Sequence, residues 1–154
     1  MIAIWRIEKE KYASESFSGD GAYLYGGRWN HPGTKVVYAA QTLALAALEK
    51  FVHLESGAAV IDFVYFKITI PKQIKIKILD YSLLPSNWRD FPVPDRTMDV
   101  GRKWAQRNES VLLRIPSTII PVESDYLINP LHADFHHLKI SKPQPFYFDT
   151  RMWK

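Results

Sequence analysis

Most apolar runs in this chain have the length and the β-branched composition of strands. They occupy residues 2–7, 35–40, 60–70, 74–79, 111–115, 119–120, 126–128 and 145–149. Only residues 42–56 and 95–108 repeat apolar side chains at helical spacing, and we expect Gly57 to end the first helix. Asp95 is expected to cap the second helix and Gly101 to interrupt it. Several strands, two helices and no regular strand–helix alternation predict an α+β fold, with mixed sheets packed as a sandwich.

Glycine and small polar residues gather at residues 14–30, between two of the predicted strands. We expect a long loop there, and loops of that length in compact domains are usually functional or mobile. A second loop is expected at residues 82–94, which prolines punctuate. No internal repeat or low-complexity linker divides the 154 residues, so we expect one domain spanning residues 1–154.

Composition narrows the class of protein. The hydrophobic fraction of 47% is that of a globular chain. The absence of cysteine excludes a disulfide framework, a thiolate zinc site and a cysteine nucleophile, and it fits a reducing cytosol. Charged or polar residues interrupt every apolar run well before the ~20 residues that a membrane span needs. We therefore expect a soluble, cytoplasmic protein that does not enter the membrane.

The net charge of +4 raises the question of a nucleic-acid partner. Lys75 and Lys77 alternate with isoleucines, which is typical of a strand with one solvated face and of a protected sheet edge. We favour that structural interpretation. The alternative is that the lysines from Lys72 to Lys77 bind phosphates, which would make the chain a non-catalytic nucleic-acid-binding growth inhibitor.

Three residues at fixed spacing suit an anionic cofactor that carries a planar base: Arg28, Tyr38 and Glu49. Arg28 follows two glycines, where backbone can approach a ligand, and its guanidinium suits a pyrophosphate. Tyr38 could stack on a nicotinamide ring or donate its hydroxyl. Glu49 could bind a ribose hydroxyl and stabilise positive charge at the anomeric carbon. Ser117 adds a polar group at the end of a predicted strand.

Each of these residues also has an ordinary structural explanation. Arg28 could be a surface residue after a turn, and Tyr38 could be a core aromatic. Glu49 falls about 40° beyond Leu45 on the helical wheel, at the margin of the apolar face, where it could face a cleft or water. Ser117 could be a turn residue. The residues taken one at a time do not decide between these alternatives.

Other site motifs fail. A dinucleotide fingerprint beginning at Gly19 has Leu24 where its third glycine belongs, and neither a P-loop nor a G-x-S-x-G elbow is present. His132 and His136 have the spacing of a metal-binding pair, with His137 beside them. They lack the H-E-x-x-H pattern, so we expect no metal.

Taken together, the chain resembles the RES domain, a bacterial toxin family named for its Arg, Glu and Ser. The resemblance covers nearly the whole chain, and the spacing of Arg28, Tyr38 and Glu49 is its most specific part. The matching blocks are Trp5-Arg6-Ile7, Gly26-Gly27-Arg28-Trp29-Asn30, Val37-Tyr38-Ala39-Ala40, Ala46-Ala47-Leu48-Glu49, Arg114-Ile115-Pro116-Ser117, Pro121-Val122-Glu123 and Leu127-Ile128-Asn129-Pro130 with His132.

The resemblance implies a fold similar to ADP-ribosyltransferases and an activity that consumes NAD. Arg28, Tyr38 and Glu49 would contact NAD, and Ser117 would complete the catalytic set. The resemblance also implies an Xre-like helix-turn-helix antitoxin that blocks the NAD pocket and carries the complex to operator DNA. The acceptor of the ribosyl group stays open between water, phosphate and a protein side chain. The roles of Arg6 and Trp29 stay open too.

Overall fold

The computed structural model describes residues 1–55 and 60–153. The strands are β1 (Ile2–Lys9), β2 (Val37–Ala40), β3 (Phe63–Ile70), β4 (Ile76–Ile78), β5 (Leu112–Pro116), β6 (Ser124–Ile128), β7 (Lys139–Ile140) and β8 (Gln144–Phe146). The α-helices are α1 (Asp20–Tyr25), α2 (Leu43–Val52) and α3 (Asp95–Arg107). Short 3₁₀ helices add η1 (Glu10–Glu15), η3 (Tyr81–Leu83), η4 (Ala133–His137) and η5 (Thr150–Met152).

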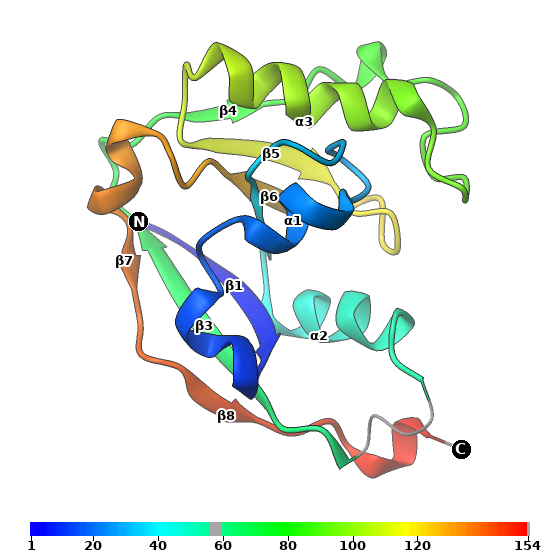
Figure 1. Cartoon of the computed structure of the whole chain (residues 1–154), viewed down its shortest axis with the longest axis vertical. Helices are drawn as coiled ribbons and strands as arrows, with labels where there is room; N and C mark the ends of the chain where they lie inside the picture. The colour runs from blue at the N-terminus through cyan, green and yellow to red at the C-terminus, as the bar shows by residue number, and fades with distance from the viewer. Residues whose placement is uncertain (56–59, 154) are drawn as a thin grey trace.

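The strands form one mixed sheet in the order β4-β5-β6-β2-β1-β3-β7, with β8 also paired to β3. β1 pairs with β3 along its whole length, whereas its sheet pairing with β2 is a single register pair, Trp5 with Ala40. The sheet curls at this narrow joint, so its two halves lie at different ends of the molecule (Figure 1). Figure 1 also shows α3 alongside β4 and β5 at one end and β8 near the C-terminus at the other. The predicted α+β class is confirmed.

Helix α2 covers the joint between the halves, where it packs against β1 and β2. The Thr42 side chain caps it by accepting a hydrogen bond from the Leu45 N–H at 3.0 Å. Leu45 and Ala46 are buried against Ala40. The helix ends at Val52 with His53 as its C-cap, earlier than predicted, and the predicted stop at Gly57 lies outside the described residues.

Helix α3 forms the connection in the chain between β4 and β5, which pair in parallel. Its N-cap is Pro94 and not the predicted Asp95, which instead lies in the first turn, where its charge complements the helix dipole. Gly101 does not interrupt the helix. A Cβ on Gly101 would lie 1.9 Å from the Trp29 carbonyl oxygen. The glycine therefore lets α3 pack directly on the backbone of residues 26–30, which we call the Gly-rich segment.

Several local expectations differ from the structure. The predicted loop at residues 14–30 contains α1 and the end of η1. Residues 119–120 form no strand, because their N–H groups donate to the Ser117 hydroxyl instead of to a neighbouring strand. The last predicted strand is the shorter β8, since Asp149 already caps η5.

The interpretation of the lysine-rich strand as a sheet edge is confirmed. β4 is the outermost strand on its side of the sheet, and Lys77 pairs with Glu109 at 3.5 Å. Within residues 1–55 and 60–153, no helix has the length and apolarity needed to cross a bilayer.

Candidate active site

The Gly-rich segment before β2 presses its backbone against the side chain of Tyr38. Gly26 has a φ of 71°, a conformation that glycine adopts without strain. A Cβ on Gly27 would lie only 2.6 Å from the Tyr38 hydroxyl oxygen. Backbone hydrogen bonds between Gly27 and Asn30 in both directions close a tight turn, which presents Arg28 at its tip.

Tyr38 joins this turn to the sheet. Its hydroxyl donates to Asn30 Oδ1 at 2.6 Å and accepts from the Trp29 N–H at 3.1 Å. Burial raises the pKa of the Tyr38 phenol far above its usual range, so the phenol stays protonated. The hydroxyl is thus engaged within the protein, and the phenol remains part of the cavity wall.

Arg28 lies at the wall of the same cavity, half-buried. Its Nη1 donates to the carbonyl oxygens of Trp88 at 3.0 Å and Asp90 at 2.7 Å. Burial lowers the pKa of the Arg28 guanidinium, whereas nearby Asp90 raises it, and an arginine remains charged in either case. Nε and Nη2 have no hydrogen-bond partner in the described part of the chain, so these donors can serve an anion.

Glu49 extends from α2 into the cavity, and its carboxylate is hydrogen-bonded by Ser117. The Ser117 hydroxyl donates to Glu49 Oε2 at 2.7 Å. The Ser117 hydroxyl oxygen in turn accepts hydrogen bonds from the N–H groups of Ile119 and Ile120 at 3.2 and 3.1 Å. Ser117 is 0% exposed and does not line the cavity, so it acts on Glu49 and not directly on a ligand.

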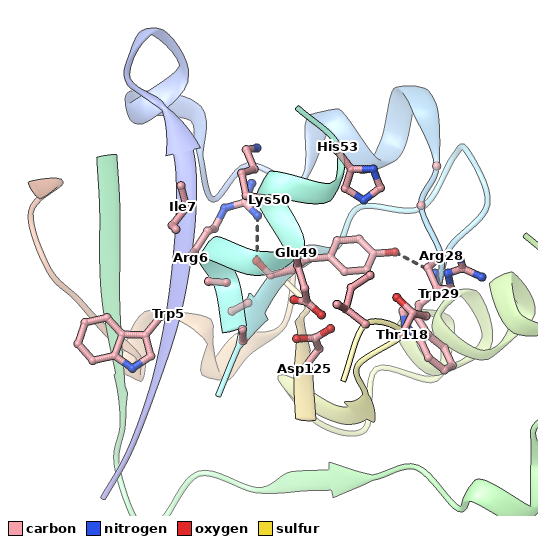
Figure 2. A pocket seen from close by; sticks show the side chains of 17 residues that line it. Trp5, Arg6, Ile7, Arg28, Trp29, Glu49, Lys50, His53, Thr118 and Asp125 are labelled. Atoms are coloured by element: carbon pink, nitrogen blue, oxygen red, sulfur yellow. Dashed lines mark hydrogen bonds between the residues drawn. The ribbon is translucent and has the colours of Figure 1, made fainter. Parts of the chain in front are cut away.

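The cavity has a volume of about 460 Å³, within the range of small-molecule sites. Arg28, Tyr38 and Glu49, which are distant in sequence, all line it. Figure 2 shows Arg28 on one side, Arg6 and Lys50 on the other, and Glu49 between them. The arrangement places cationic groups around a carboxylate, which suits a ligand with both phosphate groups and sugar hydroxyls.

Four further lining residues with titratable side chains were not among the site residues expected from the sequence: Arg6, Lys50, His53 and Asp125. The Arg6 guanidinium donates to the Tyr38 carbonyl oxygen at 2.9 Å and pairs with Glu8 at 3.1 Å, so it braces β2 from β1. Burial lowers the pKa of Arg6, and Glu8 opposes this change. A charged residue inside an apolar strand run is the signal that could have identified Arg6 from the sequence. Asp125 follows Glu123 and Ser124 and carries no such signal.

Trp29 supports the turn and does not present itself to solvent. It is 2% exposed, and its ring packs against Trp88 with centroids 5.8 Å apart. The histidines near the C-terminus have a local role, since His132 Nδ1 accepts the Asp134 N–H at 2.9 Å. In the parts of the chain that the structure describes, no cluster of three or more His, Asp or Glu side chains could hold a metal ion.

Comparison with known proteins gives the family. The RES domain model matches residues 3–149. The toxin Res of Yersinia enterocolitica is 38% identical over 98% of this chain and 99% of its own length. A Prs ADP-ribosylating toxin of a Sphingobium species is 36% identical over 97% and 96%. One chain of a solved structure, the M. tuberculosis MbcT–MbcA toxin–antitoxin complex, matches 95% of this chain over 84% of its own length. The TM-score is 0.74 at 12% sequence identity, so the two chains share a fold. The chain therefore belongs to the RES domain family, among the toxins of that family.

Proposed function

We propose that this toxin depletes NAD by cleaving the bond between nicotinamide and its ribose. The observation that carries the proposal is the convergence of Arg28, Tyr38 and Glu49 on one cavity of suitable size. A guanidinium with unused donors suits the pyrophosphate, and a carboxylate suits the ribose. The name of the Sphingobium relative supports NAD as the substrate, because ADP-ribosylation takes its ADP-ribose from NAD.

Cleavage of the nicotinamide–ribose bond requires stabilisation of a developing positive charge more than it requires proton transfer. Nicotinamide in NAD already carries a positive charge, so it leaves as a neutral molecule without a general acid. The charge passes to the ribose, whose anomeric carbon becomes oxocarbenium-like. Glu49, held by Ser117, stabilises that centre and fixes the ribose hydroxyls. Arg28 orients the cofactor through its pyrophosphate, and the Tyr38 phenol forms the wall beside it.

Removal of the carboxylate should depress turnover more than binding. We expect Glu49→Gln to slow nicotinamide release about 10²–10³-fold, the cost typical of losing one electrostatic group at a reacting centre. Arg28→Ala should raise KM and lower kcat together. Glu15→Gln and Arg96→Ala are matched controls, because both side chains are exposed and outside the cavity. Wild-type rates in Glu49→Gln and Arg28→Ala proteins with unchanged melting temperatures would refute the assignment.

The acceptor distinguishes two enzyme classes within this proposal. Transfer to water or phosphate gives an NAD glycohydrolase or phosphorylase, which depletes NAD directly. Transfer to a protein side chain is the second candidate, favoured by the relative named as an ADP-ribosylating toxin. Mass spectrometry of the products, with and without phosphate and with cell lysate, separates free ADP-ribose, its phosphate ester and modified protein.

An antitoxin partner belongs to the same proposal. The structural neighbour was solved as a toxin–antitoxin complex, which supports an antitoxin for this chain as well. We propose that this antitoxin is an Xre-like helix-turn-helix protein that covers the NAD cavity in the cytoplasm. The antitoxin would also make the contacts of the complex with operator DNA. Co-expression of the gene immediately upstream should restore growth and suppress NAD loss.

A further inference from the structure

Asp125 is the second residue of β6 and lies between Ser124 and Tyr126, whose side chains are both buried. In the sheet register it faces Ala40 of β2 on one side and Ile115 of β5 on the other. Directly paired residues project to the same side of a sheet, and both Ala40 and Asp125 line the cavity. The two residues paired with Asp125, Ala40 and Ile115, are apolar and buried, so a carboxyl group between them is unusual.

The carboxyl of Asp125 meets the carboxyl of Glu49. Figure 2 shows the two groups directed toward one another in the cavity, one from β6 and the other from α2. Asp125 Oδ1 is fully buried and has no hydrogen-bond donor among the described residues. Two ionised carboxylates in contact repel one another strongly, so one proton shared between them resolves both the repulsion and the missing partner.

The surroundings favour Asp125 as the residue that holds this proton. Burial raises the pKa of the Asp125 carboxyl to about 10, together with its contact with the Glu49 carboxyl and the negative charge of Glu123. Tyr38, from β2, also faces this group and stays neutral. The cations that line the cavity are Arg6, Arg28, Lys50 and, when protonated, His53. None of them forms an ion pair or hydrogen bond with Asp125 in the described residues.

We propose that Asp125 is a positioning residue that, in its neutral form, donates a hydrogen bond from its carboxyl O–H to the Glu49 carboxylate. This inference rests on the proposed NAD cleavage and names how its central carboxylate is held. Ser117 supplies a second donor to Glu49 from the loop after β5. The O–H groups of Ser117 and Asp125, which come from separate elements, hold the Glu49 carboxylate in place and stabilise its negative charge. Loss of the Asp125 proton at alkaline pH removes one donor and sets two negative charges against each other.

Substitutions at position 125 distinguish the role of Asp125 as a hydrogen-bond donor from its ability to ionise. Asp125→Asn keeps a donor of nearly the same shape that does not ionise, whereas Asp125→Ala removes it. We expect the turnover of the wild type to decline at alkaline pH. We expect Asp125→Asn to retain most of the turnover and not to show this decline. We expect Asp125→Ala to lower kcat about tenfold to a hundredfold with little change in KM, because Glu49 is misplaced. Asp62→Asn, at an exposed carboxylate, should keep the wild-type pH profile.

Two outcomes would overturn the proposal: an alkaline decline in Asp125→Asn that matches the wild type, or wild-type turnover in Asp125→Ala. Isotope-edited infrared spectroscopy tests the proton without any turnover. The carbonyl stretch of a protonated carboxyl should be present in the wild type at neutral pH and missing in Asp125→Asn, and its absence from the wild type would refute the proposal. Crystal structures should show the Glu49 carboxyl in place in Asp125→Asn and displaced in Asp125→Ala. These readouts stay decisive even if the protein does not cleave NAD.

Discussion

At the scale of single residues, the site depends on side chains that hold other side chains. Ser117 illustrates this, because its buried hydroxyl donates to Glu49 and accepts from the backbone N–H groups of Ile119 and Ile120. The sequence indicated Ser117 as a candidate site residue but could not show that its side chain does not line the cavity. That position depends on how the turn after β5 packs against α2, which a local sequence pattern does not predict.

Ser117→Ala should therefore act on turnover more than on NAD binding. The substitution removes one donor from Glu49 and leaves two part-buried N–H groups without their acceptor, which costs about 1–3 kcal/mol of stability. We expect kcat to fall while the dissociation constant for NAD stays close to that of the wild type. Calorimetry of NAD binding alongside the rate of nicotinamide release measures both, and a selective loss of binding would contradict this role.

At the scale of elements, the close approach of α3 to the Gly-rich segment positions Arg28. Gly101 provides the approach, since its Cα faces the Trp29 carbonyl oxygen. From the sequence alone the glycine indicated a break in the helix. The structure shows continuous helix, because the missing side chain serves packing against a segment far away in sequence. A pattern within the helix cannot distinguish these two uses of glycine.

The two explanations predict opposite signs for Gly101→Ala. Helix propensity alone would stabilise the protein by about 1 kcal/mol. The contact with Trp29 instead predicts a loss of about 1–3 kcal/mol, as for other overpacked sites, together with slower nicotinamide release. Gly21→Ala in α1 is the matched control, because a Cβ there meets nothing within 4 Å. Thermal unfolding followed by circular dichroism decides, and a stabilised Gly101→Ala protein would contradict the packing argument.

At the scale of the whole molecule, the site exists because the sheet curls. Tyr38 and Asp125 come from one half of the sheet and Arg6 from the other, while α2 brings Glu49 to the joint. The class of fold and most strands followed from apolar patterning, and the spacing of Arg28, Tyr38 and Glu49 marked the residues that share the cavity. The curl depends on the single β1–β2 register pair, which patterning does not encode.

The proton held by Asp125 also makes global stability depend on pH. The pKa of Asp125 is higher in the folded protein than the ordinary value expected when unfolded. The folded state therefore binds more protons between these two values, and the free energy of unfolding falls as pH rises through that interval. Asp125→Asn removes this contribution, so its melting temperature should decline less than that of the wild type from about pH 5 to about pH 9. Parallel curves for the two proteins would show that Asp125 is ionised in the native state.

The most direct measurement follows nicotinamide release from NAD by purified wild-type protein beside Glu49→Gln. Proton NMR of the reaction mixture reports the free nicotinamide and the remaining dinucleotide in one spectrum. The account predicts steady release by the wild type and a rate lower by about 10²-fold or more in Glu49→Gln. Equal rates for two folded proteins, or intact NAD with both, would contradict it.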